Sequence, residues 1–173
     1  MRVLGEETAK VPVVSHIVVL TPAGRSATLT HSPYPPLLLL APDELALHCA
    51  GSDMLTTLTL RVHDQPPTDT DLTPGQPPPD GVETRVWFVS KAGPLVAHSL
   101  DFDATPLPGV ELRRGEWHVR AAVWNRAAAE ALEDKLAYDD LAALEDPVPP
   151  IDELHGPDLG PELWLVDFWP VTG

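Results

Sequence analysis

Cysteine is almost absent from this chain of 173 residues, with Cys49 as its one example. A disulfide within the chain is therefore impossible, and we do not expect a zinc site built on thiolates. Long hydrophobic runs are also missing, because the longest apolar stretches, 11–20 and 37–41, fall far short of the roughly 20 residues that a membrane-spanning helix needs. The first ten residues have no apolar segment of the secretory type. We expect a cytoplasmic protein without a membrane partner.

Basic side chains are scarce, since 11 Lys and Arg face 26 Asp and Glu, for a formal net charge of −15. A nucleic-acid-binding surface needs a basic stripe, so we do not expect a nucleic-acid partner. The sequence contains only three lysines and is rich in Ala, Leu, Pro, Asp and Arg. This bias is typical of a GC-rich genome of the actinobacterial type, with a halophile as the alternative.

Alternation of apolar and polar residues is the clearest structural signal. In 54–63, Leu58, Leu60 and Val62 share one face, and Arg61 and His63 share the other, wetter face. About seven such segments occur, at 11–20, 44–49, 54–63, 82–90, 95–102, 116–124 and 162–169. The pattern predicts an all-β fold, an antiparallel two-sheet β-sandwich with a short acidic helical insert, in a single domain spanning 1–173.

Turn-forming residues and local composition predict how the strands are connected. Gly93 and Pro94 predict a hairpin turn at 91–94, between the strands at 82–90 and 95–102. Residues 64–80 hold six prolines and no basic residue, which indicates a long surface loop. Residues 127–144 lack Gly and Pro and favour helix, either as one helix or as two short helical turns.

The acidic charge is concentrated in 127–158, where ten carboxylates face the single basic residue Lys135. A dense negative field speeds and steers association with a basic partner. We therefore take this insert as a candidate partner-binding surface, the alternative being a solvated acidic face. The residues expected to attract the partner are Glu130, Glu133, Asp134, Asp139 and Asp140.

Other polar residues allow a different site. Asp101 and Asp103 would share one face of an extended strand and His98 the other, which argues against a common metal ion. His118 and Arg120 share a strand face, where they could form a small anionic site or a catalytic pair, or simply a hydrogen-bonded strand face. Cys49 has the strand parity of Leu45 and Leu47, which favours a core position over a nucleophile. No phosphate-binding loop or hydrolase motif is present, so no catalytic residue, metal or cofactor is assigned.

Three segments carry a family resemblance. They read VWFVSKAGPL at 86–95, LRRGEWHVRA at 112–121 and ELWLVDFWP at 162–170. This order resembles small uncharacterised actinobacterial β-sandwich proteins and, more distantly, the competence protein J family, which inhibits a DNA-entry nuclease, and immunity proteins of polymorphic toxin systems. The resemblance covers about the C-terminal half, and its motifs are structural, so it transfers no functional residue.

Together these observations favour a non-enzymatic acidic binding protein, an immunity or inhibitor protein that neutralises a basic nuclease or toxin. One alternative is a small-ligand-binding or metal-dependent enzyme that uses His98, Asp101, His118 and Arg120. Another is a structural subunit whose acidic loops confer solubility.

Overall fold

Strands make up most of the described chain in the computed structural model, which describes residues 1–13, 15–25, 28, 36–52, 54–68, 77–98, 109–142 and 162–171. Within these ranges there are ten strands and one helix. They are β1 (Val3–Val13), β2 (Ile17–Pro22), β3 (Leu38–Ala41), β4 (Glu44–His48), β5 (Met54–His63), β6 (Gly81–Val89), β7 (Gly93–His98), β8 (Val110–Leu112), β9 (Gly115–Trp124), α1 (Arg126–Ala142) and β10 (Leu163–Pro170).

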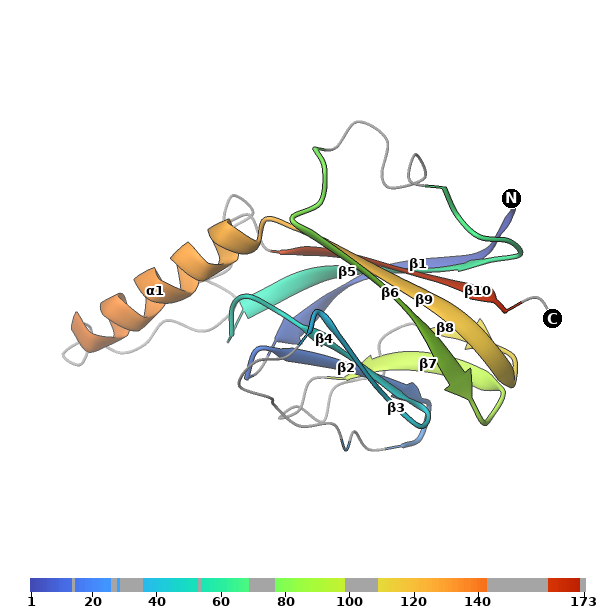
Figure 1. The fold of residues 1–173 in the computed structure, drawn as a ribbon. Helices are drawn as coiled ribbons and strands as arrows, with labels where there is room; N and C mark the ends of the chain where they lie inside the picture. Colours follow the sequence, from blue (N-terminus) through green and yellow to red (C-terminus); the bar gives the residue numbers. More distant parts are fainter. Residues whose placement is uncertain are drawn as a thin grey trace.

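The strands form two five-stranded sheets, which Figure 1 shows as an upper and a lower layer. The upper sheet has the order β1-β5-β10-β9-β6, and the lower sheet has the order β3-β4-β2-β7-β8. The expectation of a mostly β fold with two sheets and one helix is confirmed. None of the helices in the described ranges is long and apolar enough to cross a membrane.

A turn divides the predicted strand at 11–20. Ser15 and His16 have positive φ angles of 53° and 61°, and this left-handed conformation interrupts an extended chain. β1 therefore ends at Val13 in the upper sheet, and β2 begins at Ile17 in the lower sheet. The prediction of one continuous strand is wrong here, because apolar composition alone did not reveal the turn.

The predicted hairpin at 91–94 is also wrong. β6 pairs with β9 in the upper sheet, whereas β7 pairs with β2 and β8 in the lower sheet. The connection around Gly93, whose φ is 143°, carries the chain from one sheet to the other. Turn residues predict a change of direction, but they do not say which strands pair across it.

Strand β10 corrects the prediction of a fully antiparallel arrangement. It lies between β9, to which it is antiparallel, and β5, to which it is parallel. β5 and β9 run in opposite directions, so any strand placed between them must be parallel to one of the two. Strand alternation predicts which face of a strand is buried, but it does not predict the direction of the neighbouring strand.

The largest hydrophobic cluster of the described residues takes side chains from both sheets. The predicted inward face of β5 is confirmed, since Leu58, Leu60 and Val62 are buried. Trp164 and Phe168 of β10 are among the largest fully buried side chains. The main core cluster also includes Val18 and Leu20 of β2, Leu45 and Leu47 of β4, Leu95 and Ala97 of β7, and Val119 and Val123 of β9.

Helix α1 is one continuous helix that projects from the end of the sheets opposite both chain ends (Figure 1). Its first turn is held by Asp80, whose carboxylate accepts a hydrogen bond from the backbone N–H of Arg126 at 2.8 Å. Ala129 is fully buried and clusters with Ala50 and Leu132. The beginning of the helix is therefore packed against the sheets.

Candidate functional site

The acidic residues predicted to bind a partner lie on α1. Glu130 and Asp134 are exposed and lie one helical turn apart, so they share a face. Glu133 is half-buried. Asp139 and Asp140 belong to the same helix, but their side chains lie outside the described part of the structure, as does the remainder of the acidic segment at 143–158.

Glu133 contacts the turn between β1 and β2. Its Oε1 lies 3.2 Å from Nε2 of His16, and Nδ1 of the same ring lies 3.2 Å from the carbonyl oxygen of Ala50. An acceptor oxygen therefore faces each ring nitrogen of His16. The ring centroid of His48 lies 6.3 Å away. Glu133 therefore contacts the turn that joins the two sheets. The other two predicted acids with described side chains, Glu130 and Asp134, face solvent.

A buried carboxylate lies at the beginning of α1. Glu162 is 1% exposed and accepts hydrogen bonds from the backbone N–H of Ala50 at 3.1 and 3.2 Å. Nη1 of Arg126 lies 3.2 Å from its Oε1 and donates to the carbonyl of His48 at 2.9 Å. Burial raises the pKa of Glu162, although Arg126 and the surrounding donors oppose this effect. Sequence reasoning took this residue only as the beginning of a strand and missed the contact.

Cys49 is fully buried beside this carboxylate. Burial raises the pKa of its thiol well above the ordinary value of 9.0, and the negative charge of Glu162 raises it further. The thiol is therefore protonated at neutral pH. The expectation that Cys49 belongs to the core is confirmed.

A second charged cluster is buried on the outer face of the upper sheet. Asp167 of β10 is 1% exposed, and its Oδ2 accepts from Nη2 of Arg120 at 2.7 Å and from Nε at 3.1 Å. Its Oδ1 lies 2.7 Å from Nε2 of His63. The prediction that His63 lies on a wet face is wrong, because its side chain is only 1% exposed. The carboxylate of Asp167 thus faces a cation, Arg120, and a histidine, His63, inside one buried cluster.

The loop after β5 covers this cluster in part. The carbonyl of Thr68 accepts from Nη1 of Arg120 at 3.4 Å, and the carbonyl of Pro77 accepts from the indole N–H of Trp124 at 2.8 Å. The described ends of the predicted loop at 64–80 thus lie over the outer face of the upper sheet. Arg120 is occupied by structural contacts with Asp167 and the loop.

Among the described residues of the alternative enzymatic site, His98 lies apart from His118 and Arg120. His118 lies on the outer face of the upper sheet, where its ring stacks on Trp169 with centroids 5.2 Å apart. His98 lies opposite Val19 on the outer face of the lower sheet, so both sheets separate it from His118 and Arg120. Burial lowers the pKa of His98. Asp101 and Asp103 lie outside the described residues.

A group of three or more His, Cys, Asp or Glu side chains placed to hold a metal ion does not occur in the described ranges. The described residues instead show an acidic helix and several buried charged groups around a β core, with exposed apolar side chains on β1 and β6. These define a two-sheet β protein with a projecting acidic helix.

Comparison with known proteins supports the same architecture. No protein-family model matches the chain, and no curated protein is similar to it in sequence. Among solved structures, the chain is similar to ComJ from Bacillus subtilis, an inhibitor of the DNA-degrading activity of NucA. The TM-score is 0.61 at 8% identity, covering 99% of this chain and 100% of ComJ. It is also similar to the protein of crocagin biosynthetic gene J, with a TM-score of 0.55 at 15% identity over 98% of this chain and 100% of that chain.

These likenesses concern the fold and extend over nearly the whole of each chain. They agree with the sequence resemblance to the competence protein J family at the level of architecture. The actinobacterial origin stays a prediction.

Proposed function

We propose that this protein is a non-enzymatic binding protein that inhibits a basic protein partner, a nuclease or a toxin. The observation that carries the proposal is the shared fold with ComJ, a nuclease inhibitor, along the full length of both chains. The separation of His98 from His118 and Arg120 weighs against the enzymatic alternative. In this proposal the two sheets form one sandwich domain over 1–173, and the acidic segment 127–158 is an insert in it.

Electrostatic attraction supplies the first step of binding. A nuclease or a toxin directed at nucleic acid carries a basic groove for its phosphate substrate, and an acidic protein is complementary to such a groove. Glu130 and Asp134 are exposed on α1, which projects from the sheets. The formal net charge of the whole chain is −15, so the remainder of the protein adds to the negative field around them. Asp80 and Glu162 hold the beginning of the helix through their contacts with Arg126. Glu130 and Asp134 therefore extend from a helix that is fixed at its first turn.

The test is affinity capture with the full-length protein at low and at high salt, followed by an assay of the captured protein's nuclease or toxin activity. We expect a basic protein that is captured at low salt, is released or weakened at high salt and loses activity when this chain is added. A captured protein whose activity is unaffected by the chain, or the absence of any specific partner at either salt, would contradict inhibition and favour the structural-subunit alternative.

A matched pair of variants locates the attraction. Glu130→Lys on α1 and Glu116→Lys on β9 each replace one exposed acid by a base. We expect Glu130→Lys to slow association with the captured partner about tenfold, and Glu116→Lys to leave it within about twofold. Equal slowing by both variants would indicate that net charge alone acts and that α1 has no special part.

A further inference from the structure

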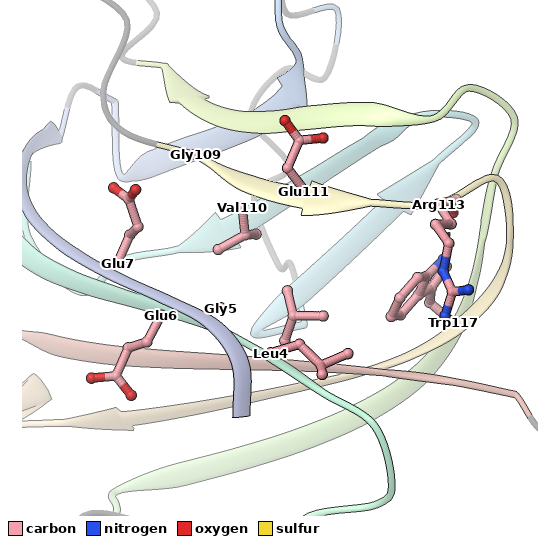
Figure 2. Close-up of a pocket in the computed structure, with 10 residues that line it drawn as sticks. Leu4, Gly5, Glu6, Glu7, Gly109, Val110, Glu111, Arg113 and Trp117 are labelled. Atoms are coloured by element: carbon pink, nitrogen blue, oxygen red, sulfur yellow. Dashed lines mark hydrogen bonds between the residues drawn. The ribbon is translucent and has the colours of Figure 1, made fainter. Parts of the chain in front are cut away.

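A groove of about 350 Å³ lies between the two sheets, at the side where β1 and β8 form their edges (Figure 2). Its apolar lining comes from Val62 of β5, Val110 of β8 and Trp117 of β9. The volume is at the lower end of the range for small-molecule pockets, so it fits one or two side chains better than a larger organic ligand.

An irregularity in β1 adds Leu4 to this groove. The register with β5 shifts between Val3 and Gly5, which leaves Leu4 as the additional residue of a β-bulge. Leu4 lines the groove and remains 53% exposed, and the neighbouring Val3 is 43% exposed. Gly5 places no side chain in the space beside it, where a Cβ atom would meet nothing within 4 Å. The bulge thus leaves an apolar side chain at the entrance instead of burying it.

The charges around the groove are mainly acidic. Glu7 of β1 and Glu111 of β8 border it from the two strands, and neither has an ion-pair or hydrogen-bond partner among the described residues. Glu6 differs, because its Oε2 accepts from Nε of Arg61 at 2.7 Å. Arg113 lines the end of the groove near Trp117 (Figure 2). The groove therefore offers two uncompensated carboxylates beside an apolar floor.

The two strands that border the groove also have unpaired edges. Among the described strands, β1 pairs only with β5, and β8 pairs only with β7. Half of the main-chain N–H and C=O groups of an edge strand point away from its neighbour and can accept an additional strand. β1 is eleven residues long, so it offers the longer template.

We propose that this groove binds an extended basic peptide segment of a protein partner as an additional strand on β1. An apolar side chain of the segment packs against Leu4, Val110 and Trp117. A lysine or arginine side chain of the segment lies beside the carboxylate of Glu7, away from Arg113, and Glu111 adds negative charge on the β8 side of the groove. The charge complementarity and the free strand edge together identify a basic strand rather than an acidic one. The proposal stands independently of whether the partner is a nuclease.

The test uses a random nonapeptide library displayed on phage and selected on the full-length protein. We expect enrichment of sequences in which a basic residue alternates with apolar residues. An enriched peptide, synthesised and labelled, should bind at least about tenfold more weakly to the variant Glu7→Lys/Glu111→Lys. It should also slow amide hydrogen exchange in residues 3–8, which lie in β1.

The matched control is Glu116→Lys on β9, an exposed residue that does not line the groove, and it is compared with the single variant Glu7→Lys. We expect this control to keep peptide affinity within about threefold. Thermal unfolding of both variants checks that they fold, and the uncharged replacement Glu7→Gln/Glu111→Gln, which should also weaken peptide binding, substitutes if the lysine variant does not fold. No enrichment of basic sequences, or equal loss of affinity in both variants, would overturn the proposal. Failure of this peptide-binding test would leave the proposed inhibition through α1 unaffected.

Discussion

Asp167 and Arg120 face each other across the two adjacent strands β10 and β9, with Oδ2 of the aspartate 2.7 Å from Nη2 of the arginine. Both side chains are almost completely buried, at 1% and 6% exposure. His63 completes the set on the other carboxylate oxygen. A buried ion pair need not add net stability compared with apolar residues, but removal of one member leaves an uncompensated charge.

Asp167→Asn should therefore destabilise the protein by about 3–5 kcal/mol, because it leaves the Arg120 guanidinium buried without a counter-charge. Urea unfolding measures the change. The matched control is Glu6→Gln, which makes the same carboxylate-to-amide change in the Arg61–Glu6 pair, where the glutamate is 47% exposed. That control should cost less than about 1 kcal/mol. Similar losses in both variants would show that burial of the Asp167 cluster has no energetic weight.

The contribution of Glu162 to the free energy of unfolding should fall as pH rises. Because burial raises its pKa above the ordinary value of 4.5, the folded protein holds this proton more tightly than the unfolded chain does. Its contribution is complete below pH 4.5 and is lost as pH rises through the raised pKa. In urea unfolding at a series of pH values, the stability of the native protein minus that of Glu162→Gln should decrease over this window by up to about 1.4 kcal/mol per pH unit. A difference that increases with pH would contradict the assignment.

Cys49 should react slowly with iodoacetamide in the folded protein. The raised pKa of its thiol keeps the thiolate fraction small, and full burial keeps the reagent away. Mass spectrometry after timed labelling at pH 8 should show complete modification in urea and very little in buffer. Rapid labelling of the native protein would mean that the end of the sheets near α1 opens readily.

Gly109 and Gly5 form a matched pair of glycines beside the same groove. A Cβ atom on Gly109 would lie 2.2 Å from the carbonyl oxygen of Leu95, whereas a Cβ atom on Gly5 would meet nothing within 4 Å. Gly109→Ala should therefore destabilise the fold by about 2 kcal/mol or more, because the contact is with backbone that must shift. Gly5→Ala should be neutral or slightly stabilising. Thermal unfolding compares the stability of the two variants with that of the native protein. A Gly109→Ala variant as stable as the native protein would refute the close approach of Gly109 to Leu95.

The sequence predicted which face of a strand is buried better than it predicted which strands pair with each other. Alternation identified Leu58 and Leu60 as inward-facing because one face of a strand must be apolar where it packs on a core. It did not predict that β10 inserts between β5 and β9, since pairing joins residues that are about a hundred positions apart. Parity correctly placed His63 opposite those core residues, but its burial depends on Asp167 and on the loop beside it.

The same limit applies to the candidate site. The acidic composition of 127–158 indicated a charged surface, and the structure places Glu130 and Asp134 on the exposed side of a helix. Composition could not indicate that Glu133 contacts His16, because that contact depends on the turn at Ser15 and His16. Nor did it separate Glu162, which is buried, from Glu130 and Asp134, which are exposed.

The central position of β10 has a consequence for the order of folding during synthesis. The upper sheet cannot join β5 to β9 until residues 163–170, the last strand in the chain order, have left the ribosome. Until then the strand edges of β5 and β9, and the core side chains that β10 covers, stay exposed on an incomplete sheet. Parallel pairing between distant segments is also slow to form. Before β10 is made, the nascent chain therefore passes through a stage at which these strand edges and core side chains are open to a chaperone.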